Sequence, residues 1–141
     1  MKAKDIVIGI AVVALLTFVV LSIKNKRATS LQPSPTPSVE QKIEDRFGGL
    51  TVPDDVEKIE LKDVSGGNGY GIATRTEVLA DLPTPTKPYQ VFLEKDGKKV
   101  LLGSMVSKKG GYLIEYNSSL YPGYDKVIVA ENGKSILEGS F

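Results

Sequence analysis

The feature that most constrains this chain is an uncharged apolar run near its start. From Ile6 to Ile23 there are 18 consecutive residues without a charged side chain. At about 1.5 Å per residue in a helix, this run spans roughly 27 Å, close to the hydrocarbon thickness of a bilayer. A buried core helix would show a polar stripe, and a cleaved signal peptide would have a shorter apolar region and a small-residue cleavage site. The run shows neither, so we expect residues 6–23 to be an uncleaved transmembrane helix that contacts the lipid bilayer.

Basic residues flank both ends of this run. The tail 1–5 and the residues after the run supply Lys2, Lys4, Lys24, Lys26 and Arg27. The positive-inside rule compares the two flanks, and here they are nearly equal once the terminal amine is counted. Charge alone therefore does not orient the helix.

Residues 24–38 combine the basic flank with a proline-rich stalk. In residues 28–38, three prolines alternate with serine and threonine, which favours extended polyproline II and prevents helix or sheet. Such a segment is either a semi-rigid spacer or a ligand for an SH3-like domain, and we favour the spacer. A stalk directly after an anchor suits a domain held outside the membrane, so we expect the C-terminal domain to be extracytoplasmic.

Residues 39–56 read as a short helix and a lead-in. Ser38 and Gln41 have the spacing of a capping box, and apolar residues recur at helical spacing, which predicts a helix over roughly 39–46. Gly48-Gly49 should end it. The acidic residues after it, Asp54, Asp55 and Glu57, lack the alternating spacing of a calcium loop, and we interpret them as a solvated turn.

From residue 57 onward the period becomes that of strands. Residues 58–62 alternate polar and apolar, residues 70–80 predict one long or two short strands, and three prolines mark the loop beyond. Residues 89–94 and 99–106 form a predicted hairpin around Asp96-Gly97. Further strands are predicted at 112–116, 127–129 and 135–137, separated by glycine-containing turns. We therefore expect residues 57–141 to be all-β, a small antiparallel β-sandwich of the immunoglobulin-like or Greek-key type, tethered to a single transmembrane helix.

Composition excludes several classes of function. The chain contains neither histidine nor cysteine, which removes the usual general base, the thiolate nucleophile and most transition-metal sites. A dyad of Ser104 or Ser107 with Lys108 would lie beside a hairpin turn, where water would leave the lysine unactivated. Residues 28–141 carry 13 basic and 16 acidic side chains, with no clustered basic face for nucleic acid. We expect no enzyme activity, cofactor, metal or nucleic-acid partner.

Tyrosines are the most informative side chains for binding. Four of the six lie between residues 112 and 124. Tyr112 and Tyr116 are expected to fill the core, and Tyr121 or Tyr124 to close a corner through a hydroxyl–backbone hydrogen bond. If the loop around Pro122 is exposed instead, Tyr121, Pro122 and Tyr124 form the candidate interaction patch, since rigid aromatic side chains supply contact area at low entropic cost.

The chain from Ala80 onward resembles the extracytoplasmic C-terminal domain of the anti-sigma-K factor family. The matching segments are Leu82-Pro83, Tyr89-Gln90-Val91-Phe92-Leu93, Val100-Leu101-Leu102-Gly103-Ser104 and Tyr124-Asp125-Lys126-Val127-Ile128-Val129-Ala130-Glu131. The resemblance implies a β-sandwich outside a bacterial cytoplasmic membrane. Family members that control a sigma factor carry a zinc-associated domain with histidine and cysteine ligands ahead of the membrane helix. This sequence has only residues 1–5 ahead of the expected helix and contains neither residue type. We therefore expect no direct sigma-factor binding here.

These observations predict a non-catalytic interaction or sensor-like module of the bacterial envelope, with another envelope protein or a glycan as its partner. The alternative is a structural envelope protein that has no discrete ligand.

Overall fold

The computed structural model describes residues 36–141. The predicted transmembrane helix 6–23, the tail before it and the basic flank after it lie outside the described residues. Within the described range, no helix is both long enough and apolar enough to cross a bilayer. The described residues form a compact unit that runs from Pro37 to Phe141.

The unit begins with one short helix, α2 (Val39–Arg46), which matches the predicted bounds. Its capping box is present: the Ser38 hydroxyl accepts from the Gln41 amide at 3.2 Å, and the Gln41 side chain accepts from the Ser38 amide at 3.2 Å. Gly48 and Gly49 come next with φ of 61° and 94°, which L side chains rarely adopt, and the helix ends there.

Nine strands make up the rest of the unit. Their bounds are β1 (Lys58–Asp63), β2 (Tyr70–Thr74), β3 (Glu77–Asp81), β4 (Gln90–Lys95), β5 (Lys98–Ser104), β6 (Val106–Lys108), β7 (Gly111–Glu115), β8 (Lys126–Glu131) and β9 (Lys134–Ser140). A 3₁₀ turn, Ser118–Leu120, lies between β7 and β8. The all-β prediction is thereby confirmed.

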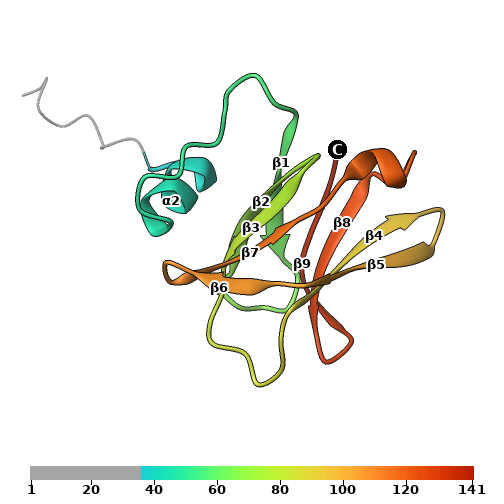
Figure 1. The fold of residues 1–141 in the computed structure, drawn as a ribbon. Coiled ribbons are helices and arrows are strands. Elements are labelled where there is room, and N and C mark those ends of the chain that lie inside the picture. The colour runs from blue at the N-terminus through green and yellow to red at the C-terminus, as the bar shows by residue number, and fades with distance from the viewer. Residues whose placement is uncertain (1–35) are drawn as a thin grey trace, which may run out of the picture. The chain divides into compact units, whose positions relative to one another are not determined.

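All nine strands belong to one antiparallel sheet in the order β5-β4-β8-β9-β1-β2-β3-β7-β6 (Figure 1). The sequence predicted a sandwich, which has two sheets. The ladders instead run without interruption, because β1 pairs with both β2 and β9, and β3 pairs with both β2 and β7. β5 and β6 are the two edges of this sheet.

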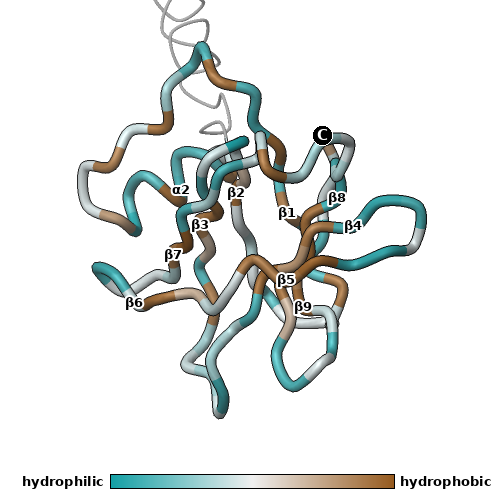
Figure 2. The backbone as a smooth tube through the Cα atoms, turned by 45° about the vertical axis from the view of Figure 1, so that its right-hand side comes forward, coloured by the Kyte–Doolittle hydropathy of each residue, from teal (hydrophilic) through white to brown (hydrophobic). Residues whose placement is uncertain are grey.

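The inner face of the sheet encloses the main core. Leu61, Val78, Val91, Val129 and Leu137, from five different strands, are all at most 1 % exposed and belong to one apolar cluster. Burial at alternate positions is a consequence of the two-residue period of a strand. Figure 2 shows the hydropathy along the backbone, with apolar residues along the strands and polar residues in turns such as the one between β4 and β5.

Several predicted turns are confirmed. Asp96-Gly97 and Asn132-Gly133 have φ between 49° and 79°, as a type I′ hairpin turn requires at both central residues. Residues 70–80 form two strands, and the single predicted strand 99–106 is divided at Met105 into β5 and β6. Met105 is buried, and its amide still donates to the Tyr89 carbonyl at 2.8 Å, but from Val106 onward the chain pairs with β7 instead of β4.

Candidate interaction surface

The outer face of the sheet is covered over one half only. Over β2, β3 and β7, the outward side chains Ile72, Leu79 and Leu113 pack against Ile43 and Phe47 of the α2 segment. The approach is close: a Cβ added at Gly111 would lie 2.5 Å from Cζ of Phe47. Figure 1 shows α2 beside these strands. We call this region the covered half.

Polar contacts also hold α2 to the covered half. The Arg46 guanidinium lies 3.0 Å from Asp81, and the Tyr70 hydroxyl donates to the same carboxylate at 2.8 Å. Burial of the Tyr70 ring, aided by the neighbouring Asp81 charge, raises the pKa of its hydroxyl. The helix is therefore fixed by both apolar and charged contacts.

The outer face of β5, β4 and β8 is arranged differently, and we call it the open half. Phe92 lies opposite both Leu101 and Ile128, so these three side chains form an apolar row across the strands. Leu101 is 50 % exposed although it lies within a strand, Phe92 is half-buried, and Ile128 is buried. In the described part of the chain, no second apolar cluster like that of α2 forms over this row. The row therefore ends at the sheet edge with apolar surface in water.

A charged ladder runs beside the apolar row. Lys126 lies 2.9 Å from Glu138 and 3.7 Å from Glu94, and Lys99 lies 3.8 Å from Glu94. The Lys126 ammonium lowers the pKa of Glu138, whose charge is thereby stabilised. These pairs neutralise one another, so the ladder gives the open half no net charge to attract a partner.

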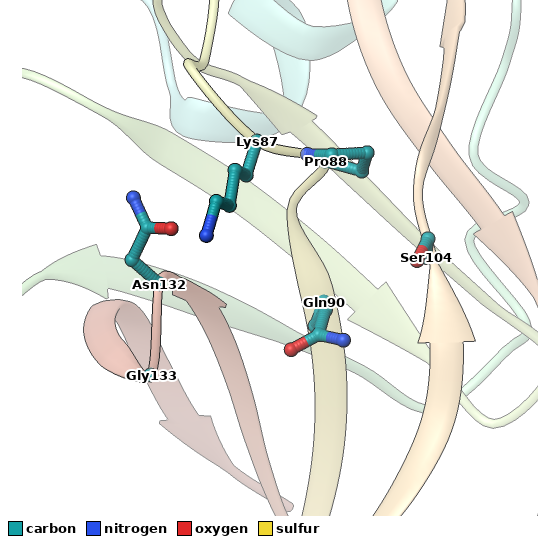
Figure 3. Close-up of a pocket in the computed structure, with 6 residues that line it drawn as sticks. All are labelled: Lys87, Pro88, Gln90, Ser104, Asn132 and Gly133. Carbon is teal, nitrogen blue, oxygen red and sulfur yellow. The ribbon is translucent and has the colours of Figure 1, made fainter.

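A polar cavity of about 610 Å³ lies at the other end of the open half (Figure 3). Gln90 and Ser104 are opposite each other on β4 and β5, one step beyond Phe92 and Leu101 on the same face. The remaining lining residues come from the loop before β4 and the turn between β8 and β9: Lys87, Pro88, Asn132 and Gly133. In Figure 3 the Lys87 side chain extends across the space toward Asn132.

The loop that carries Lys87 is fastened to the β8–β9 hairpin. One oxygen of Glu131 accepts from the Thr86 amide at 2.7 Å, the Thr86 hydroxyl at 2.9 Å and the Lys87 amide at 3.4 Å. The hydrogen bond from the Thr86 side chain is the main cause of a lowered pKa for Glu131. The backbone at Lys87 is thereby held while its ammonium group stays exposed.

The predicted patch of Tyr121, Pro122 and Tyr124 follows the 3₁₀ turn, and none of its residues lines the cavity. Pro122 is exposed, but both tyrosines are half-buried against the main core, with ring centroids 6.4 Å apart in an edge-to-face arrangement. Leu120 beside them is 70 % exposed. The loop offers a small apolar surface, and its two rings also serve the core.

The predicted hydroxyl–backbone bonds are made by other tyrosines. In residues 36–141, the Tyr116 hydroxyl donates to the Thr74 carbonyl at 2.6 Å, and the Tyr89 hydroxyl donates to the Pro83 carbonyl at 2.9 Å. Burial raises the pKa of both hydroxyls to about 12. Tyr112 and Tyr116 pack against the core as predicted.

The residues considered for chemistry are all exposed, either on the edge strands β5 and β6 or at a turn. Ser104, Ser107 and Lys108 are all exposed, and the acidic residues Asp54, Asp55 and Glu57 lie at an exposed turn. The described residues contain no group of three or more carboxylates that could hold a metal ion.

The outward position of Phe92 follows from the strand period, but the cavity does not. Alternation along 90–94 places Gln90, Phe92 and Glu94 on one face, and that signal was available. The contributions of Lys87 and Asn132 depend on the pairing of β4 with β8, which local sequence does not specify. In comparisons with known proteins, no family model matches this chain, and no curated protein or solved structure matches it either.

Proposed function

We propose that this chain is a membrane-anchored, non-catalytic interaction module of the bacterial envelope, and that it binds its partner through the open half of the sheet. The anchor is the apolar run 6–23, and the stalk 24–38 holds the domain on the extracytoplasmic side. The resemblance to the C-terminal domain of the anti-sigma-K factor family supports this location and an immunoglobulin-like or Greek-key description of the domain. The absence of histidine and cysteine from the sequence supports a role without catalysis.

The observation that carries the proposal is the contrast between the two halves of one sheet face. Apolar residues on the covered half are buried by α2, whereas Leu101 on the open half remains 50 % exposed at a sheet edge. Apolar surface beside an unpaired strand edge is typical of sites where a partner adds a strand, and here Leu101 and the half-buried Phe92 supply that surface. The half-buried rings of Tyr121 and Tyr124 make the predicted loop the weaker surface.

Site-specific photocrosslinking in cells tests this proposal. A photoreactive amino acid would replace Leu101, Leu120 or Val64 in the full chain, since all three side chains are at least 50 % exposed. We expect one discrete, saturable adduct from position 101 and none from position 64. An adduct from position 120 alone would transfer the interaction to the tyrosine loop. If no position gives an adduct at native expression, the structural alternative holds and the proposal is wrong.

Protease added to protoplasts tests the orientation separately. We expect cleavage of the domain at the same protease dose that clips a known surface protein. A domain that stays whole under those conditions would contradict the extracytoplasmic assignment without affecting the crosslinking result.

A further inference from the structure

We infer that the polar cavity binds a carboxylate of an extended peptide, and that this peptide lies along the free edge of β5. The inference rests on the proposed function and names the chemistry of the partner. Three observations carry it: the donor set of the cavity, the free strand edge next to it, and the apolar row at a fixed spacing from it.

The cavity offers hydrogen-bond donors and one positive charge. The Lys87 ammonium, the Gln90 and Asn132 amides and the Ser104 hydroxyl can all donate, and no carboxylate is among the lining residues. None of the ion pairs between described residues involves Lys87. The nearby Glu131 is held by Thr86 and by the Lys87 amide. The chemistry that complements this set is an anion with several acceptor positions, such as a carboxylate.

The surroundings favour a peptide over a sugar as the source of that carboxylate. No aromatic side chain lines the cavity, so a sugar ring has no apolar platform there. A strand edge is adjacent instead, because β5 ends the sheet and, within residues 36–141, pairs with β4 alone. An extended peptide can use the unpaired backbone groups of such an edge for affinity and its alternate side chains for specificity.

Charge on the edge also selects the partner. Lys98 is exposed on β5, and none of the ion pairs between described residues involves it. Lysines on an edge strand discourage pairing with a second copy of the same strand, whereas they attract an acidic one. The occupant that fits is thus an acidic, extended segment of another protein.

The distance between the cavity and the apolar row sets the ligand's spacing. Gln90 and Phe92 point outward from β4 two residues apart, which is about 7 Å along a strand. On β5 the register shift leaves the outward residues Leu101 and Ser104 three residues apart, so a peptide strand beside β5 would place an apolar side chain on Leu101 and a carboxylate near Ser104, facing the cavity, two or four residues away. An exposed ammonium–carboxylate pair changes affinity only about two- to fivefold, so the pair selects among peptides and the apolar row supplies more of the affinity.

The test uses the full chain in nanodiscs of zwitterionic lipid, which contribute no net charge. The probe is the fluorescein-labelled peptide Thr-Val-Thr-Val-Thr-Glu-Thr-Glu, and its partner probe carries Gln in place of both Glu. Both are also made in reversed order, because the edge could pair in either direction. Fluorescence anisotropy then measures the dissociation constants at low ionic strength, where an exposed ion pair is least screened.

We expect the acidic peptide to bind about two- to fivefold more tightly than the neutral one. Lys87→Gln should abolish that preference, and Lys134→Gln, which removes an exposed ammonium from the β8–β9 hairpin outside the cavity lining, should preserve it. Leu101→Thr should weaken both peptides by about fivefold, because half of a leucine side chain remains to be buried.

Three results would overturn the inference. Equal binding of the two peptides would remove the carboxylate assignment, and an equal effect of Lys87→Gln and Lys134→Gln would reduce it to general electrostatics. If oligogalacturonate bound with dependence on Lys87 while both acidic peptides failed, the ligand would be a glycan and the peptide assignment would be wrong. If position 101 still crosslinks a partner in cells under any of these results, the proposed function stands and only this inference fails.

Discussion

The two halves of the outer sheet face use the same strand pattern in different ways. Over β2, β3 and β7 the outward residues are large and apolar, and α2 buries them. Over β5, β4 and β8 the outward residues form an apolar row between a charged ladder and a polar cavity. The first arrangement stabilises the domain, and the second leaves binding chemistry accessible.

This difference shows that burial of an outward residue depends on which element packs over its strand. Leu113 and Leu101 are both leucines on the outer face, yet Leu113 is 8 % exposed and Leu101 is 50 % exposed. The α2 segment covers Leu113, whereas half of Leu101 is exposed to solvent. Matched substitutions on the two halves can therefore separate stability from binding.

Phenylalanine truncation should give the largest contrast. Phe47 is 2 % exposed under α2, so Phe47→Ala should lower the free energy of unfolding by about 3–5 kcal/mol through lost burial and a cavity. Phe92→Ala on the open half should cost less than about half of that, because its ring is already partly in water. Urea unfolding of the full chain in zwitterionic micelles, followed by tyrosine fluorescence, measures both. If the two variants lost equal free energy of unfolding, the Phe92 ring would be as buried as that of Phe47, and the open half would not be an exposed surface.

The hydroxyl of Tyr70 should matter less than these rings but more than a surface contact. Tyr70→Phe removes a 2.8 Å hydrogen bond to Asp81 in the covered half, and we expect a loss of about 0.5–1.5 kcal/mol. The raised pKa of Tyr70 means that its contribution is complete below the unfolded pKa near 10 and is lost as pH rises through the folded pKa. Unfolding measured at pH 8 and pH 11 should therefore show a smaller alkaline loss in the variant. An unchanged alkaline loss would place that dependence in other tyrosines.

The charged ladder of the open half should respond to acid instead. Lys126 lowers the pKa of Glu138, so this pair stabilises the fold above the unfolded pKa of Glu138, near 4.5, and its contribution is lost as pH falls through the folded pKa. Lys126→Met should cost under about 1 kcal/mol at pH 7, because the pair is partly exposed, and less at pH 3, because Glu138 takes up a proton as the pH falls. Unfolding at the two pH values measures the change, with Lys134→Met as the control for general charge. A cost at pH 3 as large as that at pH 7 would point to packing of the lysine stem.

Local features of this fold were predictable from sequence, because their causes lie within a few residues. The capping box at Ser38 and Gln41 fixed the helix start, and Asp96-Gly97 fixed a hairpin. The turn at Arg75-Thr76 contains neither glycine nor proline. It is held by the buried Thr74 hydroxyl, which accepts from the Thr76 and Glu77 amides at 3.2 and 3.1 Å. A threonine within a segment of strand-like sequence does not by itself predict a turn, so this turn could not be located from the sequence.

Non-local pairing accounts for the features that the sequence did not reveal. Alternation of Tyr112, Leu113 and Ile114 shows that β7 has two apolar faces, but it does not say that α2 covers one of them. The pairing of β4 with β8 brings Asn132 near Lys87, and the shift in register between β4 and β5 at Val91 and Phe92 sets which residues reach the cavity. These depend on the order of strands in the sheet, which hydrophobic period does not encode. The cavity therefore could not be predicted from the sequence, because it depends on which strands are paired.

The smallest effect on stability should come from the residue that the proposed function needs most. Leu101 is half exposed on an edge strand, and threonine has a high strand propensity, so Leu101→Thr should change the free energy of unfolding by no more than about 0.5 kcal/mol. The same substitution should nevertheless weaken peptide binding, because the apolar row loses its exposed end. Leu113→Thr on the covered half is the matched control: it should destabilise the domain, since it places a hydroxyl in an apolar cluster. If Leu101→Thr destabilised the fold as much as Leu113→Thr does, Leu101 would be a core residue, and its exposure would no longer argue for a binding surface.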